Sequence, residues 1–197
     1  MNPQTWWYLS RASGMVAWIV TGAACLWGIL LITRMLKPAD RPAWLLDLHR
    51  WLGILSIITV LVHMLTLLGD NYTSFTPKQL LVPGACSYVI CGVEAGPVTW
   101  GVLAFYIMVV VQLTSYFMKH MPRKLWHGIH LTSYIMFVMA TVHGVQAGNT
   151  DRGNIAFILV AAGGSSIVIF AFTARVLQAR HKKITNAQKA AFADSNN

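Results

Sequence analysis

Charged residues are scarce in this chain. Of its 197 residues, 11% are charged and only six are acidic. Soluble globular domains carry about 25% charged residues. The shortage excludes an ordinary soluble domain, and the mean hydropathy of +0.55 indicates an integral membrane protein. Little sequence lies outside the apolar segments, so we expect one membrane domain in the lipid bilayer.

The N-terminal segment lacks the basic n-region of a secretory signal. Trp6, Trp7 and Tyr8 precede Arg11 instead, so we expect the first apolar segment to direct insertion itself. The net charge of +9 does not favour a nucleic-acid partner, because a soluble nucleic-acid-binding domain could not hide several apolar segments of membrane-spanning length.

Five segments approach or exceed the length of about 20 residues that spans the hydrocarbon core. They cover residues 14–33, 49–68, 98–118, 125–147 and 154–177. Lysine and arginine concentrate after the first and third segments and in the C-terminal tail; the exceptions are Arg11, Lys78 and Arg152. Cytoplasmic loops carry this excess. We therefore predict an all-α bundle of five transmembrane helices, or six, with the N-terminus outside and the C-terminus cytoplasmic.

Cysteine is also rare, with three residues in the chain. Cys86 and Cys91 lie in the longest connection, residues 69–97, which the predicted orientation places outside. A disulfide can form there, because extracytoplasmic compartments are oxidising; two free thiols are the alternative. Cys25 lies in the first apolar segment and is expected to pack there.

Four histidines lie in apolar segments. His49 and His63 are 14 positions apart in the second segment, and His130 and His143 are 13 apart in the fourth. Ionisable residues at membrane depth are unfavourable and usually functional. The two segments run in the same direction, so depth matching predicts an inner pair, His49 and His130, and an outer pair, His63 and His143. Polar groups bonded across helices are the alternative interpretation.

Each pair fits the axial positions of a haem iron, because neutral imidazole is a good ligand and helix bundles build such sites from facing helices. At 1.5 Å per residue, two haems would lie about 20 Å apart. Fourteen steps leave His63 about 40° from His49, but thirteen leave His143 about 140° from His130. A π-bulge, a kink or a non-helical start near Gly128 would correct this. One haem instead of two, and His127 as inner ligand, stay open.

Haem propionates need cations or hydrogen-bond donors. The candidates at the inner level are Arg50, Arg123 and Lys124, and those at the outer level are Arg11, Arg152 and Asn149. His120 and His181 are expected at the surface. These assignments predict a haem-binding transmembrane domain over residues 1–178 and a basic, polar cytoplasmic tail over residues 179–197.

The strings around these histidines resemble the ferric reductase-like transmembrane domain. That superfamily includes the membrane parts of NADPH oxidases and ferric-chelate reductases, and the haem subunit of a bacterial periplasmic methionine sulfoxide reductase. The resemblance covers roughly residues 9–178 and implies b-type haems ligated by His49, His63, His130 and His143, with electrons passing across the membrane. The strings are LSRASGMVAW (9–18), LHRWLG (48–53), LVHMLTLLGD (61–70), LWHGIHLTSY (125–134) and TVHGVQAG (141–148).

The sequence departs from the pattern of these relatives in two ways. Many have six spans, and the oxidases and ferric reductases append a dehydrogenase domain for flavin and nicotinamide. This chain has no glycine-rich dinucleotide fingerprint after a strand. We therefore expect its electrons to come from a separate flavin reductase, a bound flavin or a quinol.

The resemblance predicts an electron-transfer (oxidoreductase) subunit in a bacterial inner membrane. It would pass electrons from the cytoplasmic side to an extracytoplasmic acceptor or partner protein. A self-sufficient reductase of ferric chelates, oxygen or superoxide is one alternative. A haem-free transporter or scaffold, with its histidines as proton relays or links between helices, is another.

Overall fold

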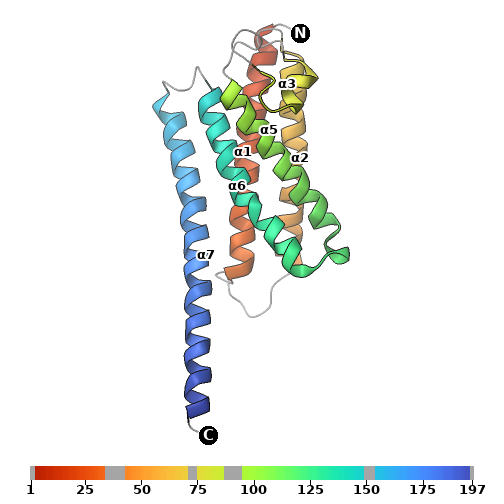
Figure 1. Cartoon of the computed structure of the whole chain (residues 1–197). Coiled ribbons are helices and arrows are strands. Elements are labelled where there is room, and N and C mark those ends of the chain that lie inside the picture. Colours follow the sequence, from red (N-terminus) through yellow and green to blue (C-terminus); the bar gives the residue numbers. More distant parts are fainter. Residues whose placement is uncertain (1–2, 34–42, 71–74, 87–94, 149–153, 196–197) are drawn as a thin grey trace.

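The computed structural model describes residues 3–33, 43–70, 75–86, 95–148 and 154–195. This part of the chain is α-helical (Figure 1). Five of its helices are long and apolar enough to cross a membrane, which confirms the predicted fold class; the orientation stays a prediction. The helices are α1 (Pro3–Thr33), α2 (Ala43–Leu68), α3 (Pro77–Leu81), α5 (Ala95–Tyr116), α6 (Arg123–Ala147) and α7 (Ile155–Ser195), with a 3₁₀ turn η1 (Met118–His120).

Helices α1 and α2 form an antiparallel hairpin. Ser13 and Thr66 share a hydroxyl–hydroxyl contact of 3.3 Å near one end. Trp27 Nε1 donates to the Leu45 carbonyl at 3.0 Å near the other. Helix α1 begins eleven residues before the predicted segment, and its first turns pack on the end of α2: a Cβ on Gly69 would lie 2.8 Å from the Trp6 ring. Aromatic packing thus lengthens α1 beyond the hydropathy signal.

Helices α5 and α6 form the second hairpin, and residues 75–86 fold onto α5. Tyr106 donates to the Leu81 carbonyl at 2.5 Å, and Gly84 N donates to Thr99 Oγ1 at 3.0 Å. Cys86 is buried beside Val98 and is disulfide-bonded. Cys91 lies outside the described residues. Cys25 is a free, buried thiol in α1, as expected.

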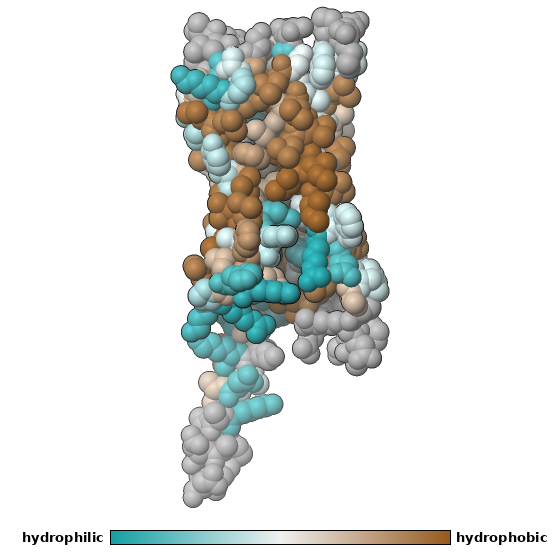
Figure 2. Space-filling model, turned by 90° about the vertical axis from the view of Figure 1, so that its right-hand side faces the viewer, coloured by the Kyte–Doolittle hydropathy of each residue, from teal (hydrophilic) through white to brown (hydrophobic). Residues whose placement is uncertain are grey.

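Helix α7 packs on α1 and α6 through small residues. A Cβ on Gly164 would lie 2.6 Å from the Trp18 ring, and Ser165 Oγ donates to Thr141 Oγ1 at 3.4 Å. The helix continues without interruption through the predicted tail as far as Ser195, so the boundary at residue 178 stays a prediction. In Figure 2, hydrophobic side chains cover much of the bundle and hydrophilic ones gather toward the end where α7 extends.

Phe137 lies at the centre of the contact between α1, α6 and α7. It is 2% exposed and packs against Cys25 and Val168. Trp18 stacks on it, with ring centres 5.6 Å apart. A Cβ on Gly22 would lie 3.0 Å from the ring. The first hairpin, the second hairpin and α7 are therefore joined through one aromatic side chain.

Replacing Phe137 by alanine should lower the stability of the bundle by about 3 kcal/mol, because the ring's dispersion contacts are lost and a cavity is left behind. The matched control is Phe170→Ala on α7, where the ring is 75% exposed. The temperature at which the purified protein aggregates in detergent should fall clearly for Phe137→Ala and little for Phe170→Ala. Equal shifts would show that this contact does not join the helices.

Candidate functional site

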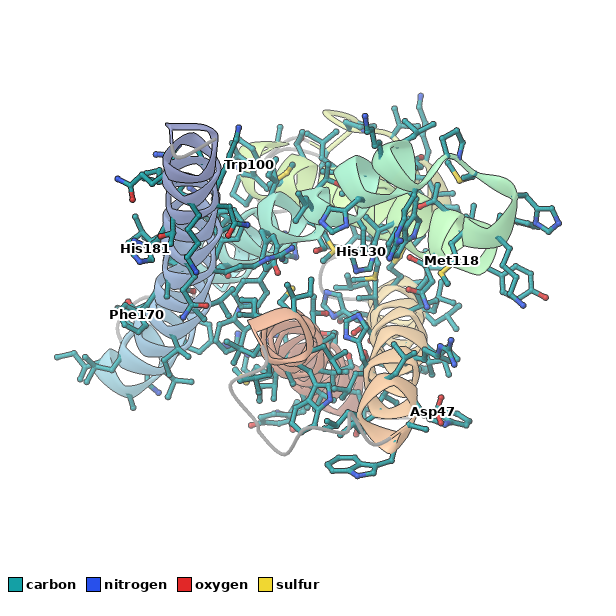
Figure 3. All side chains as sticks on the ribbon, turned by 90° about the horizontal axis from the view of Figure 1, so that it is seen from below. Asp47, Trp100, Met118, His130, Phe170 and His181 are labelled. Atoms are coloured by element: carbon teal, nitrogen blue, oxygen red, sulfur yellow. The ribbon has the colours of Figure 1, made fainter. Side chains whose placement is uncertain are left out.

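The four membrane-level histidines meet in two pairs across the bundle. In the inner pair, the ring centres of His49 and His130 are 5.9 Å apart; in the outer pair, those of His63 and His143 are 6.4 Å apart. The planes are inclined by 71° in both. Figure 3 looks along the bundle and shows His130 near its centre. These are the pairs that depth matching predicts; the names inner and outer follow the predicted orientation.

The spacing of each pair suits one metal ion between two imidazoles. Two metal–nitrogen bonds of about 2 Å, with about 1 Å from each nitrogen to its ring centre, place the ring centres about 6 Å apart. The described residues hold no group of three or more histidine, cysteine, aspartate or glutamate side chains that could bind a metal ion. A two-imidazole site therefore fits a metal whose other positions are filled by a macrocycle, as in haem.

The outer pair is oriented by backbone carbonyls. His63 Nδ1 lies 2.8 Å from the carbonyl oxygen of Ser10, and His143 Nδ1 lies 2.7 Å from that of Pro97. A carbonyl oxygen only accepts, so Nδ1 must carry the proton and donate it. The lone pair is then on Nε2, the arrangement typical of metal-binding histidines.

The inner pair has weaker partners. Ser115 Oγ donates to the Val111 carbonyl at 2.7 Å and lies 3.2 Å from His130 Nδ1. Because the Ser115 hydroxyl donates its one proton to Val111, it accepts a hydrogen bond from His130 Nδ1–H. The Nε2 of His130 is therefore free, as in the outer pair. His49 Nδ1 is buried and makes no hydrogen bond of good geometry. The backbone of Ala24 is the polar group near it. The two levels thus differ in how firmly their rings are held.

Glycines on the neighbouring helices make room for three of these rings. A Cβ on Gly14 would lie 3.0 Å from His63, and one on Gly28 would lie 3.2 Å from His49. On α5, a Cβ on Gly101 would lie only 2.7 Å from His143 Nδ1. The sequence analysis did not identify these glycines. They permit α1 and α5 to lie directly behind the histidine rings.

Apolar side chains separate the two levels. Ala104 and Met108 of α5 pack with Met136 of α6, all three buried, and Ile57 and Val60 of α2 lie against them. Each of these residues lies between the two histidine levels of its own helix or hairpin. Each pair therefore has its own surroundings, with these five apolar side chains between the two levels.

Two of the three irregularities predicted near Gly128, the π-bulge and the non-helical start, are wrong; the kink stays a prediction. Helix α6 is an α-helix from Arg123 onward, with neither a π-bulge nor a non-helical start. Figure 1 shows α5 and α6 running obliquely to α1 and α2. Helices that cross at an angle present different faces to each other at their two ends, which lets both His130 and His143 face α2. His127 instead lies beside α7, with its Nε2 3.5 Å from Arg175 Nη2.

The candidate propionate partners lie in varied surroundings. Arg50 bonds to Asp47 at 3.1 Å, and the Arg11 guanidinium lies 4.4 Å from the centre of the Trp7 ring. Arg123 is exposed in the first turn of α6. Their role stays a prediction. Lys124 is likewise exposed, while Asn149 and Arg152 lie outside the described residues.

The comparisons with known proteins agree with this geometry. The model of the family described as ferric reductase like transmembrane component matches residues 13–141. The match includes His49, His63 and His130 and ends two residues before His143. No curated protein and no solved structure matches the chain. The family match covers well over half of the chain, which therefore belongs to the ferric reductase-like transmembrane component family, membrane b-type cytochromes that transfer electrons and typically bind haem b.

Proposed function

We propose that this chain is a transmembrane b-type cytochrome with two haems, which passes electrons from the cytoplasmic side to an extracytoplasmic acceptor or partner protein. The observation that supports it is the pair of imidazole sites, with ring centres 5.9 and 6.4 Å apart. Three of the four rings have an Nδ1 partner that leaves Nε2 free to bind iron.

Haem supplies a one-electron carrier, and two axial imidazoles favour electron transfer over oxygen binding at iron. The chain itself positions the histidine rings and shields the two haem levels from each other. The carbonyls of Ser10 and Pro97 fix the outer rings, and Ser115 fixes one inner ring. The layer of Ala104, Met108 and Met136 packs between the levels and would shield them from water.

The donor and the acceptor are proposed as separate partners. A flavin reductase or a quinol would deliver electrons at the inner pair, beside the end of the bundle where the basic residues concentrate. The acceptor would bind at the outer pair, near α3 and the start of α1 (Figure 1). A bacterial inner membrane is the proposed location, because the basic residues then lie in the cytoplasm.

Transfer of electrons across a sealed membrane tests the proposal directly. The purified, haem-loaded chain is reconstituted into vesicles that trap ferricyanide, and dithionite is added outside. The trapped ferricyanide should be reduced much faster than in vesicles without protein. Because electrons must pass both levels, His63→Ala should return the rate to the background.

The matched control replaces His120 and His181 by alanine, since both side chains are exposed and lie outside the pairs. That variant should keep the full rate. A protein that binds no haem under conditions that supply it, or one that binds haem but leaves the trapped ferricyanide oxidised, would contradict the proposal.

A further inference from the structure

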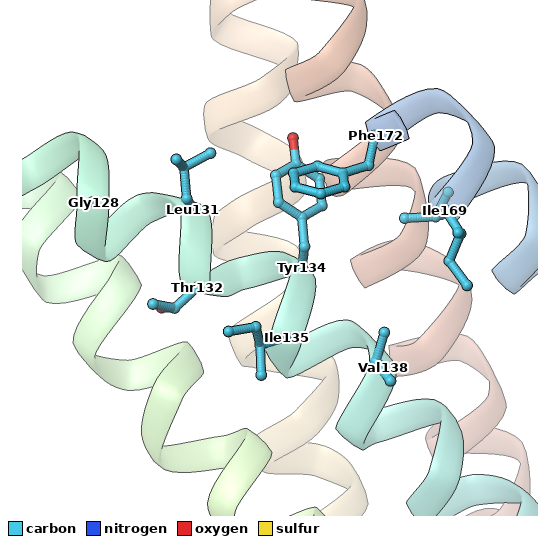
Figure 4. Close-up of a pocket in the computed structure, with 9 residues that line it drawn as sticks. Gly128, Leu131, Thr132, Tyr134, Ile135, Val138, Ile169 and Phe172 are labelled. Atoms are coloured by element: carbon cyan, nitrogen blue, oxygen red, sulfur yellow. The ribbon is translucent and has the colours of Figure 1, made fainter. Parts of the chain in front are cut away.

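An apolar groove runs between α6 and α7 on the outside of the bundle. Its volume is about 450 Å³, within the range of small-molecule sites. Figure 4 shows it with Tyr134 and Phe172 at its centre, their ring centres 4.6 Å apart. Ile135, Val138 and Ile169, which line it, are exposed. In a bilayer this groove faces hydrocarbon, so its occupant must itself be apolar along most of its length.

A cationic group lies beside the groove and bonds to one of its lining residues. Arg175, one turn beyond Phe172 on α7, donates from Nη1 to the Tyr134 hydroxyl at 2.9 Å. Its Nη2 lies 3.5 Å from His127 Nε2, and His127 directly precedes Gly128, another residue of the lining. The guanidinium thus lies beside the apolar groove, in contact with Tyr134 and His127.

No carboxylate on these two helices neutralises this charge. Helix α6 carries no acidic residue, and the one on α7 is Asp194, far along the helix from Arg175. Basic residues follow on the same helix, at Arg180 and Lys183. A partly buried guanidinium without an anion is unfavourable. The groove therefore combines an apolar channel with a guanidinium that no carboxylate of α6 or of the neighbouring turns of α7 neutralises.

We propose that the groove binds an anionic phospholipid, with an acyl chain between α6 and α7 and its phosphate at Arg175. A phospholipid offers both required parts in one molecule, and basic pockets between transmembrane helices recognise such headgroups. The guanidinium suits a phosphate because its donors match two oxygens at once. Tyr134 and His127 hold Arg175 in position for this contact.

The test measures lipid retention by native mass spectrometry of the purified full chain in detergent. Dioleoylphosphatidylglycerol and dioleoylphosphatidylcholine are added separately, with inorganic phosphate as a third probe. The anionic lipid should bind about fivefold more tightly than the zwitterionic one. Arg175→Gln should remove this preference, Arg175→Lys should keep part of it, and Arg180→Gln, which removes the same charge outside the groove, should leave it intact.

Other outcomes would overturn the proposal. Equal losses for Arg175→Gln and Arg180→Gln would indicate attraction to general surface charge. Displacement of the lipid by inorganic phosphate, with no effect of the groove-filling variant Val138→Trp, would indicate a phosphate site without an acyl chain. Loss of haem from Arg175→Gln with lipid binding unchanged would assign Arg175 to a propionate. Haem content is measured in the same samples, so failure here is distinguishable from failure of the proposed function.

Discussion

Replacing His143 by alanine should give a protein that binds one haem where the parent chain binds two. The variant removes one imidazole of the outer pair and leaves the inner pair complete. The buried layer formed by Ala104, Met108 and Met136 separates the two levels. Loss of the outer haem should therefore leave the inner haem bound. His130→Ala should produce the complementary loss at the inner level, and the double variant should bind none.

Haem per chain, measured by extraction and by the reduced-minus-oxidised spectrum, checks this prediction. His120→Ala is the control, because that side chain is exposed after α5. The series also decides between His130 and His127. If His127 were the inner ligand, His130→Ala would keep two haems. Loss of both haems from either single variant would contradict the independence of the two levels.

The histidine pairs could be predicted from the sequence because few geometric facts determine them. Long apolar segments must be helices in lipid, where backbone groups have no other partners. The rise per residue then fixes the depth of each histidine. His49 and His63 lie on a segment that runs in the same direction as the segment of His130 and His143, so equal depth is sufficient to match them.

The angular argument could not decide the pairing, because it treated α6 as straight and parallel to its partner. A separation of about 140° between His130 and His143 excludes a common face only when two helices lie side by side along their length. The tilt between hairpins depends on the packing of particular side chains, such as Trp18 and Phe137. No local pattern in the sequence reports that tilt.

The partners of the histidine Nδ1 atoms were also beyond prediction. The carbonyls of Ser10 and Pro97 carry no signal in the sequence, because every residue has a carbonyl and only the register of the hairpins selects these two. The length of α1 was missed for a similar reason. Its first turns pack Trp6 against Gly69, directly after the end of α2, and a hydropathy window does not detect such a contact.

The glycines behind the rings, in contrast, left a signal that could have been used. Gly14 and Gly28 are 14 positions apart, as are His49 and His63. In an antiparallel hairpin, if one glycine lies opposite one histidine, equal spacing on the two helices places the second glycine opposite the second histidine. Gly28 then faces His49 and Gly14 faces His63, as the structure shows.

Replacing Gly101 by leucine should remove the outer haem almost completely, although the substitution replaces no ligand. A Cβ at this position would lie 2.7 Å from His143 Nδ1, and that atom is bonded to the Pro97 carbonyl one turn earlier on the same helix. The ring can move aside only by breaking this bond, and the leucine side chain adds bulk beyond the Cβ. Gly101→Ala should give a partial loss.

The matched control is Gly144→Ala, next to His143 in the chain, where a new Cβ meets nothing within 4 Å. Both alanine variants raise intrinsic helix propensity, so a loss of haem in Gly101→Ala alone cannot come from weakening the helix. Haem per chain should stay near the parent value for Gly144→Ala and fall to about half for Gly101→Leu.

The inner haem serves as an internal standard for the Gly101→Leu variant. If its spectrum persists while the outer haem is lost, the bundle is folded and the effect is local to His143. If both haems persist, the approach of α5 to the ring does not matter for binding. Gly28→Leu should give the mirror result, because its Cβ would lie 3.2 Å from His49. Opposite losses from two glycine variants on different helices would show that the rings of His143 and His49 are each held from behind by the helix packed against them.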